Sequence, residues 1–130
     1  MKADMQNLWD NLVFYYKQTE EFQLIILNNK KVEYMWDNNN TSLLKFLHKN
    51  DIQYAKSNGR FIERIGACLA VKLAYNKISP KANLNDIFIQ RDTRGAPTLW
   101  YQTYEIKHVV ISLTHIPNYS GACLHKSNIF

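Results

Sequence analysis

Cysteine, proline and glycine are scarce in this sequence, with two, three and four of them among 130 residues. Cys68 and Cys123 are too far apart for a zinc knuckle, and the four histidines do not cluster with them. Structural zinc and a disulfide are therefore not expected, and both cysteines are expected as small buried side chains. No apolar run approaches the ~20 residues that a membrane span needs, so no membrane is expected as a partner.

The composition is that of a folded, water-soluble chain. Hydrophobic residues make up 46% of it and aromatic residues 13%, which is enough for a packed core and excludes wholesale disorder. The first residues include Asp4 and Asp10, unlike a secretory signal or a basic transit peptide. We expect a cytoplasmic protein with an amphipathic helical extension over residues 1–20 and a single domain over residues 21–130.

The net charge of +5 is concentrated in the middle of the chain. Residues 45–81 contain eight Lys and Arg but only two acids, whereas residues 1–44 contain four Lys and six acids. Such a segment suits an acidic partner, or it is simply a solvated helix face. The pI of about 9.2 also fits a nucleic-acid-binding module. No DNA- or RNA-binding motif accompanies the charge, so no nucleic acid is expected.

Helices are predicted mainly in the first 80 residues. Apolar residues at helical spacing predict an amphipathic helix over residues 5–19. Residues 22–27 and 31–36 are predicted to be extended, residues 37–41 form an asparagine-rich loop, and a helix follows through residue 47. After a break at residues 57–59, the strongest pattern predicts a largely buried helix over residues 60–78. Gly66 within it indicates that another backbone passes close by.

Strands are predicted in the last third of the chain. Residues 87–89 and 97–101 form a hairpin, and residues 108–113 and 119–125 form a second pair. Helices followed by antiparallel strands indicate the α+β class.

Four short motifs, in this order along the chain, resemble motifs of the holo-acyl-carrier-protein synthases, a family of 4′-phosphopantetheinyl transferases. They are Val32-Glu33; Ala70-Val71-Lys72-Leu73-Ala74 with Lys77; residues 86–92 with Gly95-Ala96-Pro97; and residues 110–115 with Tyr119-Ser120-Gly121-Ala122. The resemblance covers roughly residues 22–126. It implies a phosphopantetheinyl-transferase-like fold, in which a long buried helix packs on a mainly antiparallel sheet.

The resemblance also implies an activity. The family transfers the 4′-phosphopantetheine arm of coenzyme A to a serine of an acyl carrier protein, in fatty-acid or polyketide biosynthesis. Its members are homotrimers with active sites between subunits, and a magnesium ion bridges the pyrophosphate. We therefore expect coenzyme A as the substrate, an acyl carrier protein as the partner, and a homotrimer or a mixed assembly with a related subunit.

This sequence departs from the family at the metal-binding positions. The resemblance aligns Lys30 with the metal-binding aspartate, Leu73 with the metal-binding glutamate and Cys68 with an arginine. Magnesium is therefore in doubt, because its ligands are hard oxygen donors. The Lys30 ammonium is expected to replace the ion beside Leu73, which would leave a reduced or metal-independent activity. The alternative is a catalytically inactive relative that binds an acyl carrier protein or a partner subunit.

The resemblance assigns roles to a small set of residues. Lys30 and Lys72 are the candidate catalytic residues, and Lys72, Lys77 and His115 are the candidate coenzyme-A-binding residues. Lys77 is otherwise a lysine that complements a helix dipole, and His115 is otherwise a turn residue with a local hydrogen bond. The candidate surface for the acidic carrier protein consists of Lys45, Lys49, Lys56, Arg60 and Arg64.

Overall fold

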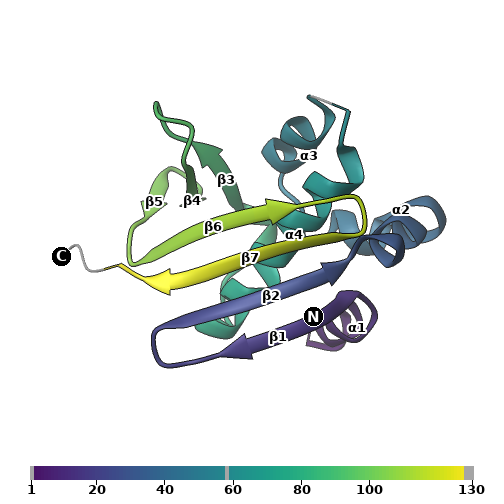
Figure 1. The fold of residues 1–130 in the computed structure, drawn as a ribbon, viewed down its shortest axis with the longest axis horizontal. Coiled ribbons are helices and arrows are strands. Elements are labelled where there is room, and N and C mark those ends of the chain that lie inside the picture. Colours follow the sequence, from purple (N-terminus) through teal and green to yellow (C-terminus); the bar gives the residue numbers. More distant parts are fainter. Residues whose placement is uncertain (1, 58, 128–130) are drawn as a thin grey trace.

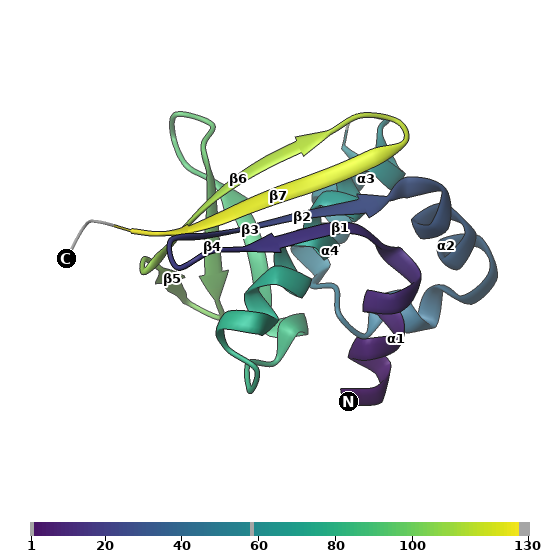
Figure 2. The ribbon, with the colours of Figure 1, turned by 60° about the horizontal axis from the view of Figure 1, so that its bottom comes forward.

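The longest helix packs across one face of a four-stranded antiparallel sheet, and no helix in the described part of the chain covers the opposite face (Figure 1; Figure 2). The computed structural model describes residues 2–57 and 59–127. Its elements are α1 (Lys2–Leu12), β1 (Val13–Gln18), β2 (Phe22–Asn28), α2 (Asn29–Leu44), α3 (Lys49–Lys56), α4 (Phe61–Ile78), the 3₁₀ helix η1 (Leu84–Asp86), β3 (Ile87–Arg91), β4 (Pro97–Tyr101), β5 (Tyr104–Ile106), β6 (Val109–His115) and β7 (Tyr119–Lys126). The strand order is β1-β2-β7-β6 in the large sheet and β3-β4-β5 in the small one.

Helix α4 is the centre of the core. Residues 65–75 are all buried, because this helix lies between the inner face of the large sheet and the small sheet. The inner face contributes Ile25 and Leu27 from β2 and Ala122 and Leu124 from β7. The predicted α+β class, the helix over residues 60–78 and the strand pairs of the last third are confirmed. Asn58, in the predicted break before α4, and residues 128–130 of the predicted domain lie outside the described residues.

Two predictions for the first third are wrong. The helix predicted over residues 5–19 ends at Leu12, and residues 13–18 form β1, which pairs with β2 and thereby joins the N-terminal segment to the sheet. Residues 31–36, predicted as extended, belong to α2. The Asn28 side chain caps α2 by accepting hydrogen bonds from the Lys30 and Lys31 amides. The asparagine run does interrupt this helix, since Asn39 has a non-helical backbone.

A buried ion pair anchors the middle of α4. The side chains of Lys72 and Asp51 are 1% and 0% exposed, and Lys72 Nζ lies 2.5 Å from Asp51 Oδ2. The same ammonium donates to the carbonyl oxygens of Phe46 (2.8 Å) and Leu84 (3.0 Å). All three ammonium protons therefore have acceptors, which come from α3, the segment before it and η1.

Replacing Lys72 is expected to destabilise the folded protein and not only to impair a reaction. The change Lys72→Met leaves the Asp51 carboxylate buried without its partner, so we expect a loss of about 3–5 kcal/mol in the free energy of unfolding, measured in urea. The double variant Lys72→Met with Asp51→Asn should lose less, because no buried charge is left unpaired. A single variant within about 1 kcal/mol of the wild type would contradict a structural role.

A histidine caps helix α3. The Nδ1 atom of His48 accepts a hydrogen bond from the Asn50 amide at 3.0 Å, and the His48 amide donates to Asp51 Oδ2 at 2.9 Å. The cap requires an unprotonated Nδ1. Partial burial lowers the pKa of His48 below its ordinary value, against the opposing effect of Asp51. The cap is therefore maintained by a neutral imidazole.

This cap makes part of the stability depend on pH. Because the pKa of His48 is lower in the folded chain, the unfolded chain binds more protons as the pH falls through about 6.5, and stability decreases there. The variant His48→Asn keeps a side-chain acceptor at the cap but does not titrate. Urea unfolding at about pH 7.5 and about pH 5 should show a smaller acid loss in this variant than in the wild type. Equal losses would mean that His48 is not the titrating group.

Candidate functional site

The first turn of α4, the start of α2 and the β6–β7 turn meet around a shallow hollow of about 420 Å³. We call it the α4-start hollow. It is lined by Asn29, Lys30, Glu33, Gly59, Arg60, Phe61, Ile62, Glu63, Pro117 and Asn118. It is therefore built from three segments that are far apart in the sequence.

Hydrogen bonds hold these three segments together. The side-chain amide of Asn29, which is 1% exposed, donates to the Ile116 carbonyl at 3.0 Å, and the Asn29 amide donates to the Asn118 carbonyl at 2.9 Å. The hydroxyl of Ser120 donates to the Glu63 carbonyl at 2.6 Å. A Cβ added to Gly66 would collide with the side chains of Asn29 and Ser120. The neighbours that require a glycine are thus two side chains, not the backbone that the sequence indicated.

A histidine–carboxylate pair lies beside the hollow. Nδ1 of His115, at the end of β6, is 3.0 Å from Oε1 of Glu63, in the first turn of α4. The two side chains are 19% and 15% exposed, so water and small molecules still reach them. The carboxylate orients the ring and occupies Nδ1, which leaves Nε2 to exchange a proton with a substrate.

Two cations share the hollow with this pair. Lys30 and Arg60 are exposed, and neither has a carboxylate within ion-pair distance among residues 2–57 and 59–127. The hollow also contains Glu33 and Glu63, of which Glu63 is engaged by His115. This end of α4 therefore combines unpaired positive charge with a group able to accept a proton.

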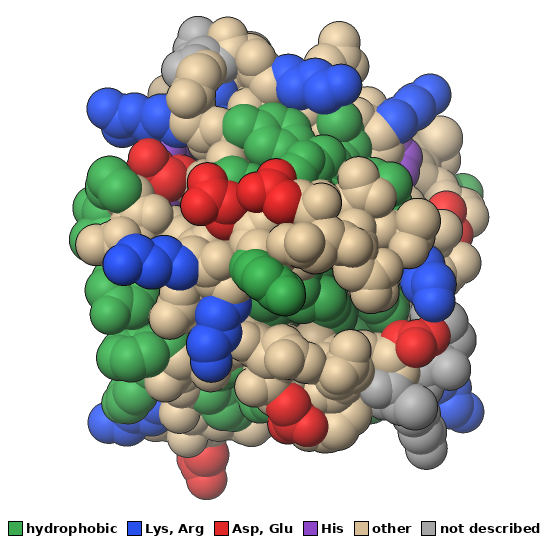
Figure 3. Space-filling model, turned by 90° about the vertical axis from the view of Figure 1, so that its right-hand side faces the viewer, with side chains coloured by type: hydrophobic (Ala, Val, Ile, Leu, Met, Phe, Trp, Pro, Cys, Tyr) green, Lys and Arg blue, Asp and Glu red, His purple; other side chains and the backbone are tan. Residues whose placement is uncertain are grey.

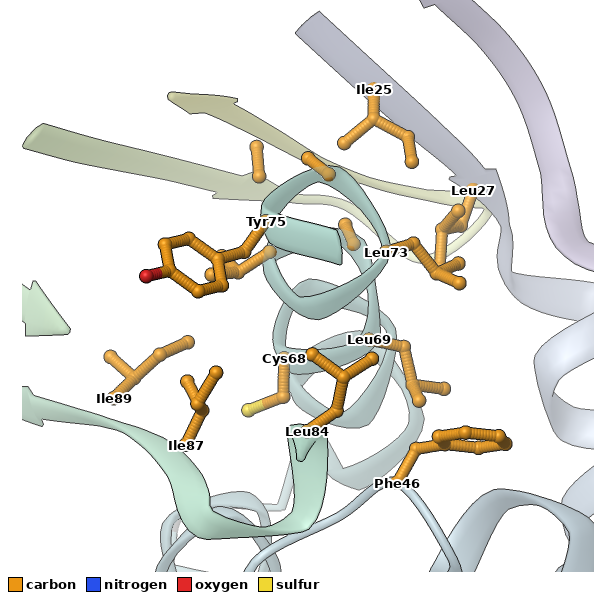
Figure 4. Close-up of a cluster of buried hydrophobic side chains, with 14 of the residues drawn as sticks. Ile25, Leu27, Phe46, Cys68, Leu69, Leu73, Tyr75, Leu84, Ile87 and Ile89 are labelled. Atoms are coloured by element: carbon orange, nitrogen blue, oxygen red, sulfur yellow. The ribbon is translucent and has the colours of Figure 1, made fainter. Parts of the chain in front are cut away.

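The structure separates Lys30 from Leu73. Leu73 is 1% exposed and points toward Leu27 of β2 within the core (Figure 4). Glu63, which lines the hollow with Lys30, is ten residues earlier in α4, or ~15 Å along the helix axis. Lys30 is exposed at the hollow and Leu73 is enclosed in the core, so the two side chains do not line one open site in this structure, and the replacement of an ion by the Lys30 ammonium stays a prediction.

The residues present do not fit a magnesium ion at these two positions. An octahedral hard cation needs oxygen donors around one point. Position 73 offers an alkyl group packed among other alkyl groups, and position 30 offers an exposed ammonium instead of an oxygen donor. No group of three or more His, Cys, Asp or Glu side chains suited to a metal occurs in the described ranges.

The remaining predicted residues lie in different places. Lys72 is enclosed in the core by its ion pair, so a substrate does not reach its ammonium in this structure. Lys77 lies at the far end of α4 with its ammonium 4.4 Å from the centre of the Trp9 ring, a cation–π contact. Glu63 and Lys77 are fourteen residues apart, which is ~21 Å along the helix.

The five candidate partner-binding residues lie in three different places. Lys49 and Lys56 are exposed at the two ends of α3. Lys45 forms an exposed ion pair with Asp4 of α1 at 3.6 Å, Arg60 lines the α4-start hollow, and Arg64 turns toward α3. Sequence reasoning missed Glu63, because its partner His115 is 52 residues away in the chain.

Comparisons with known proteins rest on structure alone. No protein-family model matches the sequence, and no curated protein matches it. The solved structures that match include holo-(acyl-carrier-protein) synthases. The protein from Bacillus anthracis str. Ames, in complex with CoA (3′,5′-ADP), is 25% identical with a TM-score of 0.64, over 82% of this chain and 96% of that one.

Two further holo-(acyl-carrier-protein) synthases agree with this match. The Helicobacter pylori protein, in complex with coenzyme A, has 18% identity and a TM-score of 0.64, over 82% of this chain and 99% of its own. The Plasmodium yoelii protein has 17% identity and a TM-score of 0.65, over 85% and 98%. The same helix, hairpin and strand pair that carry the sequence motifs are present here in the same order. By its fold, the chain is similar to the holo-(acyl-carrier-protein) synthases.

Proposed function

We propose that this protein transfers the 4′-phosphopantetheine arm of coenzyme A to a serine of an acyl carrier protein, without a magnesium ion held at positions 30 and 73. The similar B. anthracis and H. pylori proteins are described in complex with the coenzyme, and both are named for action on acyl carrier protein. The observation that carries the proposal is the His115–Glu63 pair beside the unpaired cations Lys30 and Arg60.

The reaction would be completed between two copies of the chain. His115 and Lys77 lie near opposite ends of α4, ~21 Å apart along its axis, whereas a pyrophosphate spans only a few ångströms. The resemblance to the family implies active sites between subunits. We therefore place the α4-start hollow of one copy against the Lys77 end of the next, so that Lys30, Arg60 and Lys77 surround one pyrophosphate.

The side chains have the chemistry that this transfer needs. The serine oxygen of the carrier protein attacks one phosphorus of the pyrophosphate, the bond to the other phosphate breaks, and 3′,5′-ADP leaves. Nε2 of His115 accepts the hydroxyl proton, and Glu63 stabilises the resulting imidazolium. The three cations stabilise the negative charge that develops on the phosphoryl oxygens. Lysine and arginine do not fix phosphoryl oxygens as an octahedral ion does, so the transfer is expected to be slow.

A second function is favoured by the core around α4. Leu73 is packed against β2 and Lys72 is locked to Asp51, so the two motif positions nearest to the family's metal offer no reactive group. A protein of this kind would bind coenzyme A or an acyl carrier protein, or assemble with a related subunit, without transferring the arm. The experiment below separates the two functions.

Transfer is measured as the mass gain of an apo-acyl carrier protein incubated with coenzyme A and this protein. We expect a slow gain that a chelator leaves unchanged, because no acids at positions 30 and 73 hold a metal. His115→Ala and Lys77→Ala should each reduce the rate at least ~100-fold, the usual contribution of a positioned acid or base. A mixture of the two variants, after subunit exchange, should regain about one quarter of the wild-type rate, because that share of sites receives both intact residues.

The matched control is Lys31→Ala, which removes an exposed lysine next to Lys30 but outside the hollow. It should keep the wild-type rate. A mixture with no recovery would contradict the site shared between copies. A wild-type protein that binds coenzyme A without any mass gain would establish the second function, and loss of activity with the chelator would overturn the metal-independent transfer.

A further inference from the structure

The ammonium of Lys77 lies over an aromatic ring from the N-terminal helix. Its Nζ atom is 4.4 Å from the centre of the Trp9 ring. Trp9 belongs to α1 and Lys77 to the last turn of α4, so this contact connects the two helices. A cation this close to an aromatic ring is attracted by the negative face of the ring. The flexible lysine side chain is therefore held in one place at the end of α4.

The Trp9 ring is itself held by its neighbours. Tyr16 of β1 packs against it edge-on, with the ring centres 4.9 Å apart and the ring planes at 75°. Leu8 and Leu12, on the same helix as Trp9, are 1% and 0% exposed, which anchors α1 in the core. Lys77 is thus placed by a ring that has little freedom to move.

The contact with Trp9 holds the charge of Lys77 without neutralising it. No carboxylate lies within ion-pair distance of this ammonium in residues 2–57 and 59–127, and none of its protons has a hydrogen-bond acceptor there. Lys72, the other lysine of the same motif, donates instead to Asp51 and to two carbonyl groups. The donors of Lys77 are therefore available to an anionic ligand such as a phosphate.

Lys77 borders an open hollow of about 270 Å³ at this end of the molecule. The other titratable side chains that line this hollow are Glu20, Glu21, His108, His125 and Lys126. Lys77 is exposed, and Trp9 is not among the residues that line the hollow. A ligand that approaches from the hollow therefore meets Lys77 without first displacing the ring that holds it.

We propose that Trp9 is a positioning residue for the transfer: its ring fixes the Lys77 ammonium where the pyrophosphate of coenzyme A binds between two copies. This inference rests on the proposed function. A lysine on a free side chain replaces an octahedral ion poorly, because it loses conformational entropy on binding and has no fixed direction. A lysine that a ring already holds loses less entropy, so it binds a phosphate more tightly and orients it better.

Trp9 lies in a segment that the resemblance to the family does not include. The resemblance begins near residue 22, and the three similar structures described above are matched over 96%, 99% and 98% of their length by only 82%, 82% and 85% of this chain. This chain therefore has residues without a counterpart in them. It also has Lys30 and Leu73 at the positions aligned with metal-binding acids. A helix that fixes a cation is what a site without those acids needs.

The density of surface charge does not by itself place a cation at the pyrophosphate. On the side of the molecule that carries α2, Lys and Arg side chains are dispersed around a group of acidic ones (Figure 3). In the α4-start hollow itself, Lys30 and Arg60 have Glu33 among the lining residues beside them. A pyrophosphate bound there needs a further cation in a defined position, and under the proposed function Lys77 of the next copy is that cation.

The first test changes the electron density of the ring and keeps its shape. The tryptophan at position 9 is replaced by a series of fluorinated tryptophans, in which the ring face attracts a cation less strongly. The affinity for coenzyme A is measured by calorimetry, so the result does not require transfer. We expect the affinity to fall with each added fluorine, severalfold over the series. In the Lys77→Ala variant the same series should have no effect.

Ordinary variants extend the test to the transfer rate. Trp9→Leu should lower kcat/KM for coenzyme A about tenfold, whereas Trp9→Phe keeps an aromatic face and should stay within about threefold of the wild type. Adding Trp9→Leu to Lys77→Ala should cause no further loss, because Trp9 acts through Lys77. The control is Tyr15→Leu, which removes an exposed aromatic ring of β1 and should leave kcat/KM within about twofold.

Several outcomes would overturn the proposal. An affinity for coenzyme A that does not change with fluorination would show that the ring only packs α1 against α4. A higher affinity or rate in Trp9→Leu would show that Trp9 withholds Lys77 from the ligand. A wild-type protein that does not bind coenzyme A would contradict both this proposal and the proposed function. Binding that depends on fluorination, without any mass gain of the carrier protein, would support the placement of Lys77 at the pyrophosphate while contradicting the transfer.

Discussion

The buried ion pair between Lys72 and Asp51 joins α4 to α3 inside the core, where apolar contacts and the hydrogen bonds of Arg64 also connect the two helices. Its ammonium also binds the carbonyl groups of Phe46 and Leu84, so α4, α3 and η1 meet at one charged group inside the core. Three acceptors in fixed positions allow only one arrangement of these segments, since any shift would leave a buried charge or carbonyl unsatisfied. The positions of α3 and of the hairpin that follows η1 depend on this constraint.

The ends of α4 differ in chemical character because of where its neighbours come from. At its start, turns and a helix N-terminus bring polar groups together around His115 and Glu63. In its middle, sheet strands surround it with alkyl groups, and Leu73 is one of them (Figure 4). A carboxylate at position 73 would be costly to desolvate among these side chains. Apart from the buried Lys72–Asp51 pair, the charged residues of α4 lie near its two ends, outside this apolar middle.

The sequence predicts the structure best where neighbouring residues alone determine which element forms. The buried helix over residues 60–78 and the hairpin around Asp92 and Gly95 were predictable, because apolar spacing and turn residues act locally. Residues 13–18 were not, since Val13 and Tyr16 fit a helical stripe equally well and only pairing with β2 makes them a strand. Asn28 is an N-cap residue that signals the start of α2, and the prediction of an extended segment over residues 31–36 did not take it into account. The Glu63–His115 pair depends on folding across 52 residues and leaves no local trace.

The tight contact around Gly66 has an evolutionary consequence. Three positions from three segments, Asn29, Gly66 and Ser120, occupy one small volume, and the Asn29 side-chain oxygen there has no hydrogen-bond partner within the described chain. A larger residue at any one of them needs a smaller residue at another. When relatives of this chain are aligned, these positions should change together, as a covarying triplet that ties the start of α2 and β7 to the same point on α4.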